Sequence, residues 1–133
     1  MDTISSPLEV VRAAYAAFGA GNIPAILDLV SEDIDWTFRG AKGLPYTGNF
    51  RGRNAVEKWF ASVAQADEIQ AFEPREFLVG GENVTVLGWE RTRALPDGNV
   101  FDTDWVHVFT IRGGRVARFW GIYDTQAAAA ARS

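Results

Sequence analysis

The stretch NVTVLGWERTRALPDGNVFDTDWVHVFTIRGGRVARFWGIY, residues 83–123, decides the fold. Two turn signals, Pro96-Asp97-Gly98-Asn99 and Gly113-Gly114, divide it into three segments rich in β-branched and aromatic residues. Asp-Gly supplies the positive φ angles that a tight hairpin needs. We therefore expect three consecutive antiparallel strands, with His107, the one histidine of the chain, on the middle strand.

Three helices are expected before these strands. Ser6–Glu9 is a capping box with proline at the first helical position, and Tyr15 belongs to the apolar face of the helix that follows. Asn22 caps a second, shorter helix. A third helix carries Trp59 and Phe60 on one face, which predicts that this face is buried.

The remaining segments predict further strands and one long loop. Residues 34–38 read as a short strand, and residues 69–79 as another that Pro74 places at a sheet edge or at a bulge. Asp124 caps a short helical tail. Residues 40–52 form a glycine-punctuated loop, which three apolar side chains mark as a flap: Leu44, Tyr46 and Phe50.

Composition indicates a single domain, residues 1–133, of α+β class. Apolar residues make up 47% and charged residues 23%, which is typical of a globular protein. The net charge is −4 with scattered Lys and Arg, so nucleic acid is not an expected partner. There is no cysteine, no run long enough for a membrane span, and no signal-peptide pattern in residues 1–7, and we expect a cytoplasmic protein.

Aromatic residues are abundant, with five Trp, nine Phe and three Tyr making 13% of the chain. They fill a core and a buried dimer interface in one interpretation, because aromatic side chains dominate both. In a second interpretation they line a cavity for a flat apolar ligand. The two interpretations are compatible.

Several short motifs span nearly the whole chain: Val11–Tyr15 with Ala20–Asn22, Leu29–Asp33, Tyr46–Gly48 with Arg51–Arg53, His107–Phe109, Gly114–Val116 and Tyr123-Asp124. With the order of elements, they resemble the SnoaL-like polyketide cyclases and ketosteroid isomerase-related proteins of the nuclear transport factor 2-like superfamily. The resemblance implies a cone-shaped roll, in which a curved antiparallel sheet packs against three N-terminal helices around an apolar pocket. It also implies a homodimer through the outer face of the sheet.

The resemblance transfers neither of two well-understood reactions. In ketosteroid isomerase, the oxyanion-hole tyrosine matches Tyr15 and the protonated aspartate falls at His107, but the catalytic aspartate base falls at Phe38. The aspartate–arginine–aspartate set of limonene-epoxide hydrolase falls at Glu90, Gly88 and Gly121. Both catalytic sets are therefore broken in this chain.

Strand register nevertheless points to Glu90 and His107. If Asp97-Gly98 form a two-residue turn, Glu90 faces Trp105 and Gly88 faces His107, on one side of the sheet. Glu90 and His107 are then diagonal neighbours, roughly 7–8 Å apart by backbone. A carboxylate beside an imidazole that lies in apolar surroundings favours general acid–base chemistry near neutral pH. Gly88 would leave room there for a ligand.

Each candidate also has a structural interpretation. His107 is then a hydrogen-bonded residue of the pocket wall, Tyr15 is a core residue, and Glu90 pairs with Arg91, Arg93 or Lys58 at a solvated edge. For the last strand, a strict turn puts Trp120 on the face of His107, whereas the resemblance implies Phe119, Gly121 and Tyr123, which we follow. The expected pocket wall comprises Trp36, Phe38, Tyr46, Trp59, Phe60, Gly88, Trp105, Phe109, Phe119 and Tyr123.

We expect a small cofactor-independent enzyme that binds a hydrophobic, cyclic or polyketide-like molecule. Its reaction would be isomerisation, cyclisation or hydrolysis, with His107 and Glu90 moving protons and Tyr15 assisting. The alternatives are a binding module without turnover and a dimerisation domain whose pocket is closed by its own aromatic residues. No nucleotide, flavin or metal site is indicated, since Asp102 and Asp104 share a strand face without histidine.

Overall fold

The structure, a computed structural model, describes residues 6–132. Residues 1–5, on which most of the signal-peptide expectation rests, and residue 133 lie outside the described residues. The elements follow in the order α1 (Pro7–Gly19), α2 (Ile23–Leu29), β1 (Val30–Arg39), β2 (Gly48–Arg51), α3 (Arg53–Ala66), β3 (Asp67–Gly80), β4 (Asn83–Ala94), β5 (Val100–Arg112), β6 (Arg115–Tyr123) and α4 (Thr125–Ala130).

Side-chain hydrogen bonds cap the start of α1, α2 and α4 where the sequence predicts. At α1 the Ser6 hydroxyl accepts from the Glu9 backbone N–H at 3.2 Å, and the Ser6 N–H donates to the Glu9 carboxylate at 3.0 Å. At α2 the Asn22 side chain accepts from a backbone N–H of the first turn. Asp124 caps α4 in the same way, with its carboxylate 3.0 Å from the Ala127 nitrogen.

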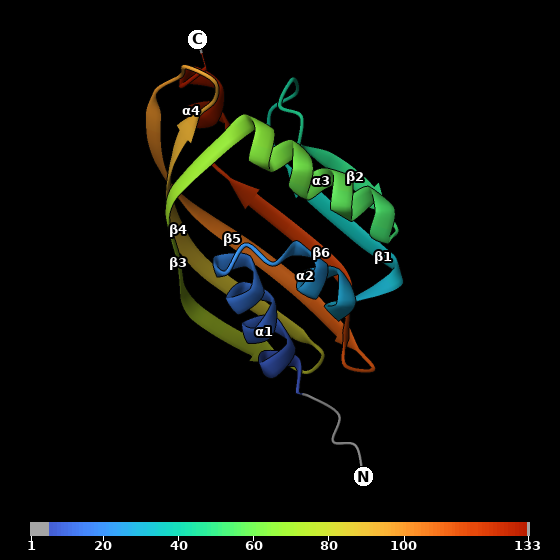
Figure 1. Cartoon of the computed structure of the whole chain (residues 1–133). Helices are drawn as coiled ribbons and strands as arrows, with labels where there is room; N and C mark the ends of the chain where they lie inside the picture. Colours follow the sequence, from blue (N-terminus) through green and yellow to red (C-terminus); the bar gives the residue numbers. More distant parts are fainter. Residues whose placement is uncertain (1–5, 133) are drawn as a thin grey trace.

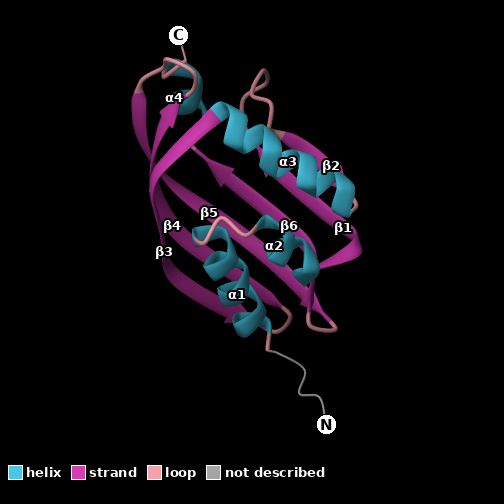
Figure 2. Ribbon diagram, in the orientation of Figure 1, coloured by secondary structure: helices cyan, strands magenta, loops and turns pink. Residues whose placement is uncertain are grey.

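The six strands form one curved, open sheet in the order β2-β1-β6-β5-β4-β3. Helices α1, α2 and α3 all lie over one face of it, and α4 lies at one end (Figures 1 and 2). The predicted α+β architecture is confirmed, with one addition. Because β1 pairs with β6 in parallel, the sheet is mixed rather than purely antiparallel.

Strand β3 lies at the edge of the sheet, and its pairing with β4 shifts register at Pro74, so both expectations for this segment are confirmed. The first strand is longer than expected, since β1 begins at Val30. The predicted loop contains a short strand, β2, that pairs with β1. Within the loop, Leu44 and Tyr46 are buried, and both belong to the core.

The register between β4 and β5 differs from the prediction by two residues. Gly88 pairs with Trp105, and His107 pairs with Val86. The predicted two-residue turn is wrong, because the last pair is Arg93–Val100 and a longer loop follows it. A shift of two residues changes partners but keeps each side chain on its face of the sheet.

The register between β5 and β6 follows the family pattern. The turn at Gly113-Gly114 is strict, because Arg112 pairs with Arg115, so the irregular turn that we expected with this pattern is wrong. A bulge next to Thr110 shifts the register instead and brings His107 opposite Gly121 and Phe109 opposite Phe119. Phe119 is therefore buried beneath the helices, while Trp120 belongs to the opposite face. Within residues 6–132, no helix has the length and apolar character needed to cross a membrane.

Candidate functional site

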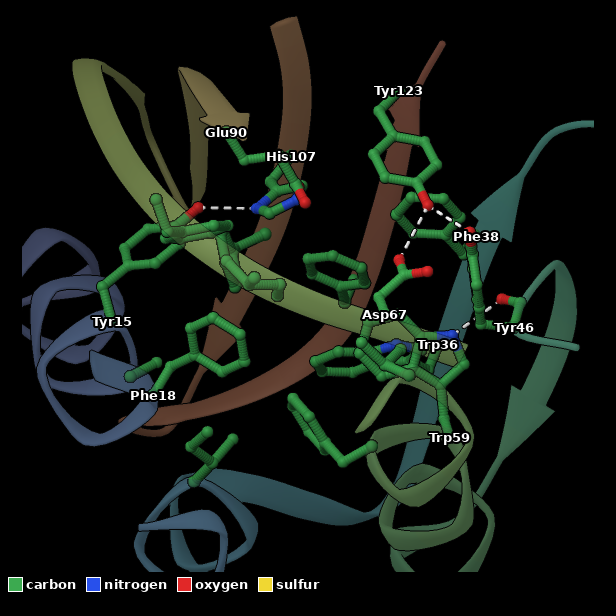
Figure 3. Close-up of a pocket in the computed structure, with 18 residues that line it drawn as sticks. Tyr15, Phe18, Trp36, Phe38, Tyr46, Trp59, Asp67, Glu90, His107 and Tyr123 are labelled. Atoms are coloured by element: carbon green, nitrogen blue, oxygen red, sulfur yellow. Dashed lines mark hydrogen bonds between the residues drawn. The ribbon is translucent and has the colours of Figure 1, made fainter. Parts of the chain in front are cut away.

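A cavity lies between the helices and the concave face of the sheet (Figure 3). Its volume is about 90 Å³, and the cavity opens to solvent at one side. Aromatic side chains dominate its wall, and eight of those named from the sequence are among them: Trp36, Phe38, Tyr46, Trp59, Phe60, Phe109, Phe119 and Tyr123.

Gly88 and Trp105 are not part of this wall, and the predicted gap beside His107 is wrong. A Cβ atom added to Gly88 would lie 2.2 Å from Cζ2 of Trp105. The indole ring occupies that space and stacks on the His107 ring, with centroids 4.0 Å apart, and on Phe72, at 4.9 Å. The missing side chain of Gly88 thus makes room for a tryptophan and not for a ligand.

Tyr15 and His107 meet at one side of the cavity, which we call the imidazole end. The Tyr15 hydroxyl, from α1, lies 2.8 Å from Nδ1 of His107, from β5 (Figure 3). Burial lowers the pKa of His107 to about 3 and raises the pKa of Tyr15 above its ordinary value. Both groups are therefore neutral at neutral pH, and the imidazole tautomer decides which of them donates in this bond.

Glu90 projects from β4 into the same cavity and is 6% exposed. The Thr92 hydroxyl donates to its Oε2 at 2.5 Å, and Oε1 makes no hydrogen bond with another residue within 6–132. Burial raises the pKa of Glu90 to about 7, the negative charge of Asp67 acts in the same direction, and the bond from Thr92 opposes them. A carboxyl of this kind both takes up and releases protons near neutral pH.

The predicted contact between Glu90 and His107 is wrong, because each has a different hydrogen-bond partner and their register places them further apart. Glu90 is four residues along β4 from Val86, which pairs with His107. The solvated-edge alternative is also wrong. Arg91 pairs with Asp102 and Arg93 pairs with Glu68, both on the surface.

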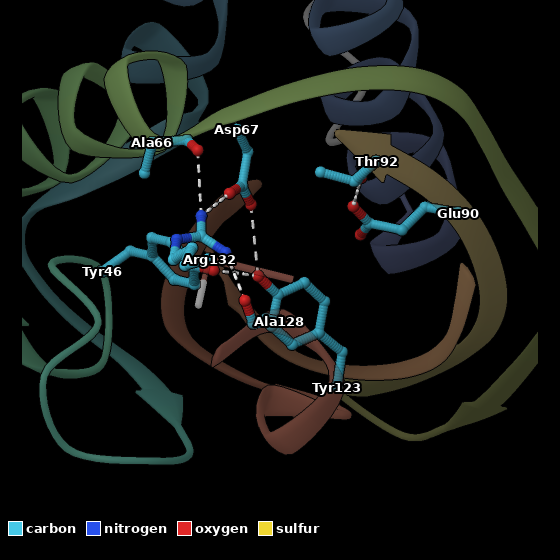
Figure 4. Close-up of polar contacts among 8 residues, drawn as sticks. All are labelled: Tyr46, Ala66, Asp67, Glu90, Thr92, Tyr123, Ala128 and Arg132. Carbon is cyan, nitrogen blue, oxygen red and sulfur yellow. Dashed lines mark hydrogen bonds and ion pairs between the residues drawn. The ribbon is translucent and has the colours of Figure 1, made fainter. Parts of the chain in front are cut away.

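Sequence reasoning missed Asp67, which defines a second polar region that we call the carboxylate end. Asp67 is the first residue of β3, is 6% exposed and lines the cavity. Its carboxylate accepts from the Tyr123 hydroxyl at 3.2 Å and from Arg132, while the Tyr123 and Tyr46 hydroxyls bond to each other (Figure 4). The Trp59 indole N–H donates to the Tyr46 carbonyl at 2.8 Å and fixes the loop.

No local signal marks Asp67, since an acidic residue directly after a helix is ordinarily solvated. Its partner Arg132 is 65 residues away along the chain. The cavity also contains Phe18 and Phe72, whose rings meet edge to face at 5.0 Å. Across residues 6–132, His, Asp and Glu side chains form no group of three that could hold a metal ion.

A curved open sheet whose concave face is covered by helices over an aromatic cavity defines a nuclear transport factor 2-like fold. Residues 11–119 match the SnoaL-like domain, so the chain belongs to the SnoaL-like family. The predicted family is confirmed.

Known proteins of similar sequence and structure support this assignment. A crystal structure of an NTF2-like protein from Burkholderia xenovorans LB400 has 31% identity and a TM-score of 0.86, with coverage of 98% of this chain and 100% of that one. TerC, co-crystallised with polyporic acid, has 27% identity and a TM-score of 0.82, covering 96% and 98%. An uncharacterized protein of Mycobacterium tuberculosis H37Rv is 27% identical over 95% of both chains.

Proposed function

We propose that this protein is a small cofactor-independent enzyme that moves protons on a hydrophobic, cyclic molecule bound in the aromatic cavity. The observation that carries the proposal is the carboxyl group of Glu90. Glu90 is 6% exposed among apolar wall residues, and its hydrogen bond from Thr92 goes to Oε2, which leaves Oε1 without a partner among the described residues. A buried carboxyl with free acceptor capacity is costly to keep in a wall whose only role is packing.

Glu90 serves as the general base and then as the general acid. Its pKa of about 7 gives comparable amounts of both protonation states at neutral pH. Such a carboxyl can remove a proton from a C–H group next to a carbonyl and return it at another carbon of the same molecule. This transfer needs no redox partner, because the electron pair remains in the substrate as an enolate.

The imidazole end serves as the donor that stabilises the enolate oxygen. In the tautomer that carries its proton on Nε2, His107 accepts from Tyr15 at Nδ1, and its Nε2 proton is left for a ligand because Nε2 has no hydrogen-bond partner within residues 6–132. A preorganised donor in a water-poor cavity stabilises developing negative charge. Glu90 and His107 both line this cavity, so a carbonyl oxygen can face His107 while the neighbouring C–H group faces Glu90.

The co-crystallisation of TerC with polyporic acid supports a small-molecule ligand for this cavity. The test uses 2-tetralone, a bicyclic ketone whose C–H groups next to the carbonyl exchange slowly in D2O. We expect the protein to accelerate deuterium uptake above the buffer rate, and Glu90→Gln to remove the acceleration. Equal rates for the two proteins, with 2-tetralone shown by NMR to be bound, would contradict the role of Glu90.

A binding module without turnover is the second candidate function. It is favoured by Phe38, buried at the position of the catalytic aspartate base of ketosteroid isomerase. The signal of His107, the one histidine in the sequence, separates the two candidates without assignment work. A binding module should give two results together. Polycyclic ketones should shift the His107 signal, and none of them should exchange deuterium faster than in buffer.

We also propose that the outer face of the sheet forms a homodimer. Val106 pairs with Leu87 on one side and Ile122 on the other, and these apolar side chains lie on the face away from the helices. Ile122 remains 38% exposed in the monomer. Light scattering should give a dimer mass that Val106→Glu halves, while Val79→Glu, at an exposed edge position, leaves it unchanged.

A further inference from the structure

Arg132 joins three elements behind the carboxylate end. Its guanidinium donates to the Ala128 carbonyl of α4 at 2.7 Å, to the Ala66 carbonyl at the end of α3 at 2.9 Å, and to the Asp67 carboxylate (Figure 4). It also lies over the Tyr46 ring, 5.9 Å from the centroid. This fork of donors fixes the direction of Asp67 from behind the cavity wall.

Asp67 and Arg132 differ in their exposure. The Asp67 side chain is 3% exposed and faces the cavity, whereas the Arg132 side chain is 21% exposed. Burial raises the pKa of Asp67, and the hydrogen bond and charge of Arg132 oppose this effect. Without its partner, a carboxyl at this depth would take up a proton.

Glu90 lies between the two polar regions. On β4 it is four residues from Val86, which pairs with His107, and four residues from Ala94, which pairs with Asp67. Both carboxyl groups line one apolar cavity, where like charges repel over longer distances than in water.

We propose that Asp67 is a second functional carboxylate and that Arg132 is its positioning residue, which keeps Asp67 charged so that Glu90 retains a proton at neutral pH. The inference rests on the proposed function only in assigning proton transfer to Glu90. It adds a distant residue, Arg132, that sets the pH range in which Glu90 works.

The groups that share the cavity with Glu90 come from every element packed around it. They are Tyr15 of α1, Tyr46 of the loop before β2, Asp67 of β3, His107 of β5 and Tyr123 of β6. Burial keeps the three tyrosines and His107 neutral at pH 7, so Asp67 is the negative charge in this set that acts on Glu90.

A purely structural role makes a different prediction. In that case the pair of Asp67 and Arg132 only fastens the segment after α4 to the end of α3, and its loss lowers the melting temperature without changing the titration of Glu90. The pH midpoint of Glu90 therefore separates the two roles.

The experiment follows the side-chain carboxyl carbon of Glu90 by ¹³C NMR from pH 4 to 9, with the signal assigned by its loss in Glu90→Gln. Asp67→Asn should lower the midpoint by about half to one pH unit. Arg132→Gln should lower it as well, because Asp67 then takes up a proton. The double variant should show no additional shift, and Arg132→Lys should stay near the wild-type midpoint.

Asp102→Asn is the matched control, since it removes one carboxylate paired with an arginine on the exposed face of the sheet. We expect no shift of the Glu90 midpoint in this variant. If Asp67→Asn does not fold, the Glu90 midpoints of Arg132→Gln and Arg132→Lys are compared instead. An unchanged midpoint in Asp67→Asn, or a raised one in Arg132→Gln, would overturn the proposal.

The titration needs no turnover, so its failure is distinct from failure of the proposed function. If Glu90 responds to Asp67 but no ketone exchanges deuterium, the coupling stands and the proton-transfer role fails. If Glu90→Gln abolishes exchange while Asp67→Asn leaves both the midpoint and the pH profile of exchange unchanged, Glu90 acts without Asp67 and this inference fails.

Discussion

The imidazole end and the carboxylate end face each other across one apolar cavity, but burial acts on them differently. At the imidazole end, burial lowers the pKa of His107 to about 3 and leaves a neutral pair of hydrogen-bonding rings. At the carboxylate end, Arg132 compensates the charge of Asp67. The difference follows from the partner that each group has, since Tyr15 is uncharged and Arg132 is a cation.

Glu90 belongs to neither pair, and this explains its chemistry. It has a hydroxyl partner, Thr92, and no cation, so burial raises its pKa to about 7. Burial in this cavity moves the pKa of His107 away from neutral pH and moves the pKa of Glu90 toward it. Histidine is ordinarily the acid–base group near neutral pH. Here the histidine is a fixed donor and the glutamate is the acid–base group.

The largest expected effect is on proton transfer. Glu90→Gln should slow deuterium exchange of 2-tetralone by about 10²–10⁴-fold, which is the usual contribution of a general base. His107→Gln should reduce the rate less and leave the pH midpoint of exchange unchanged, because His107 does not titrate in this range. A larger loss in His107→Gln, together with a lost midpoint, would reverse the assignment of the two roles.

The next effect is a pH dependence of stability. The pKa of Glu90 is raised from 4.5 in the unfolded chain to about 7, so the folded state binds more protons between these values and its stability falls as pH rises. Relative to pH 4, Glu90→Gln should gain about 3 kcal/mol over wild type by pH 8. Urea unfolding at both pH values measures this difference, and an equal gain at pH 4 would contradict its electrostatic origin.

His107 changes the stability with pH in the opposite direction to Glu90. Its pKa is lowered from 6.5 to about 3, so the unfolded state binds more protons between these values and stability falls as pH decreases below 6.5. In Glu90→Gln, where the Glu90 contribution is absent, unfolding free energies should therefore rise steadily from pH 4 to 6.5.

A smaller effect is expected from adding a side chain at Gly88, where the Trp105 ring leaves no space. Gly88→Ala places a Cβ against the Trp105 indole, and overpacking of this kind costs about 1–3 kcal/mol. Because Trp105 stacks on His107, the NMR signal of His107 should shift as well. Gly80→Ala, a β3 glycine with no atom within 4 Å of its added Cβ, is the control and should leave that signal in place.

The smallest effect concerns the bond between Tyr15 and His107. Tyr15→Phe keeps the ring contacts and removes the hydroxyl, so the unfolding free energy should fall by about 1 kcal/mol. The ¹⁵N shift of His107 Nδ1 should move toward the value of an unbonded acceptor nitrogen. An unchanged Nδ1 shift would show that this bond is absent in solution.

Local patterns in the sequence determined the elements and the family. The capping box at Ser6, the turn residues at Gly113-Gly114 and the proline of β3 each act within a few residues, so they can be recognised without the rest of the chain. The alternation of buried and exposed residues in β4 and β5 predicted the aromatic wall, because every second residue of a strand lies on the same face of the sheet.

Tertiary structure alone decided the partners of the site residues. Tyr15 and His107 are 92 residues apart, and Asp67 and Arg132 are 65 apart, so no local pattern encodes either contact. The loop after β4 is held by its own backbone bonds and by the Ala131 carbonyl, which accepts from Asn99 at 2.8 Å. This closure sets the register that separates Glu90 from His107, because register depends on loop geometry while the hydrophobic pattern repeats every two residues.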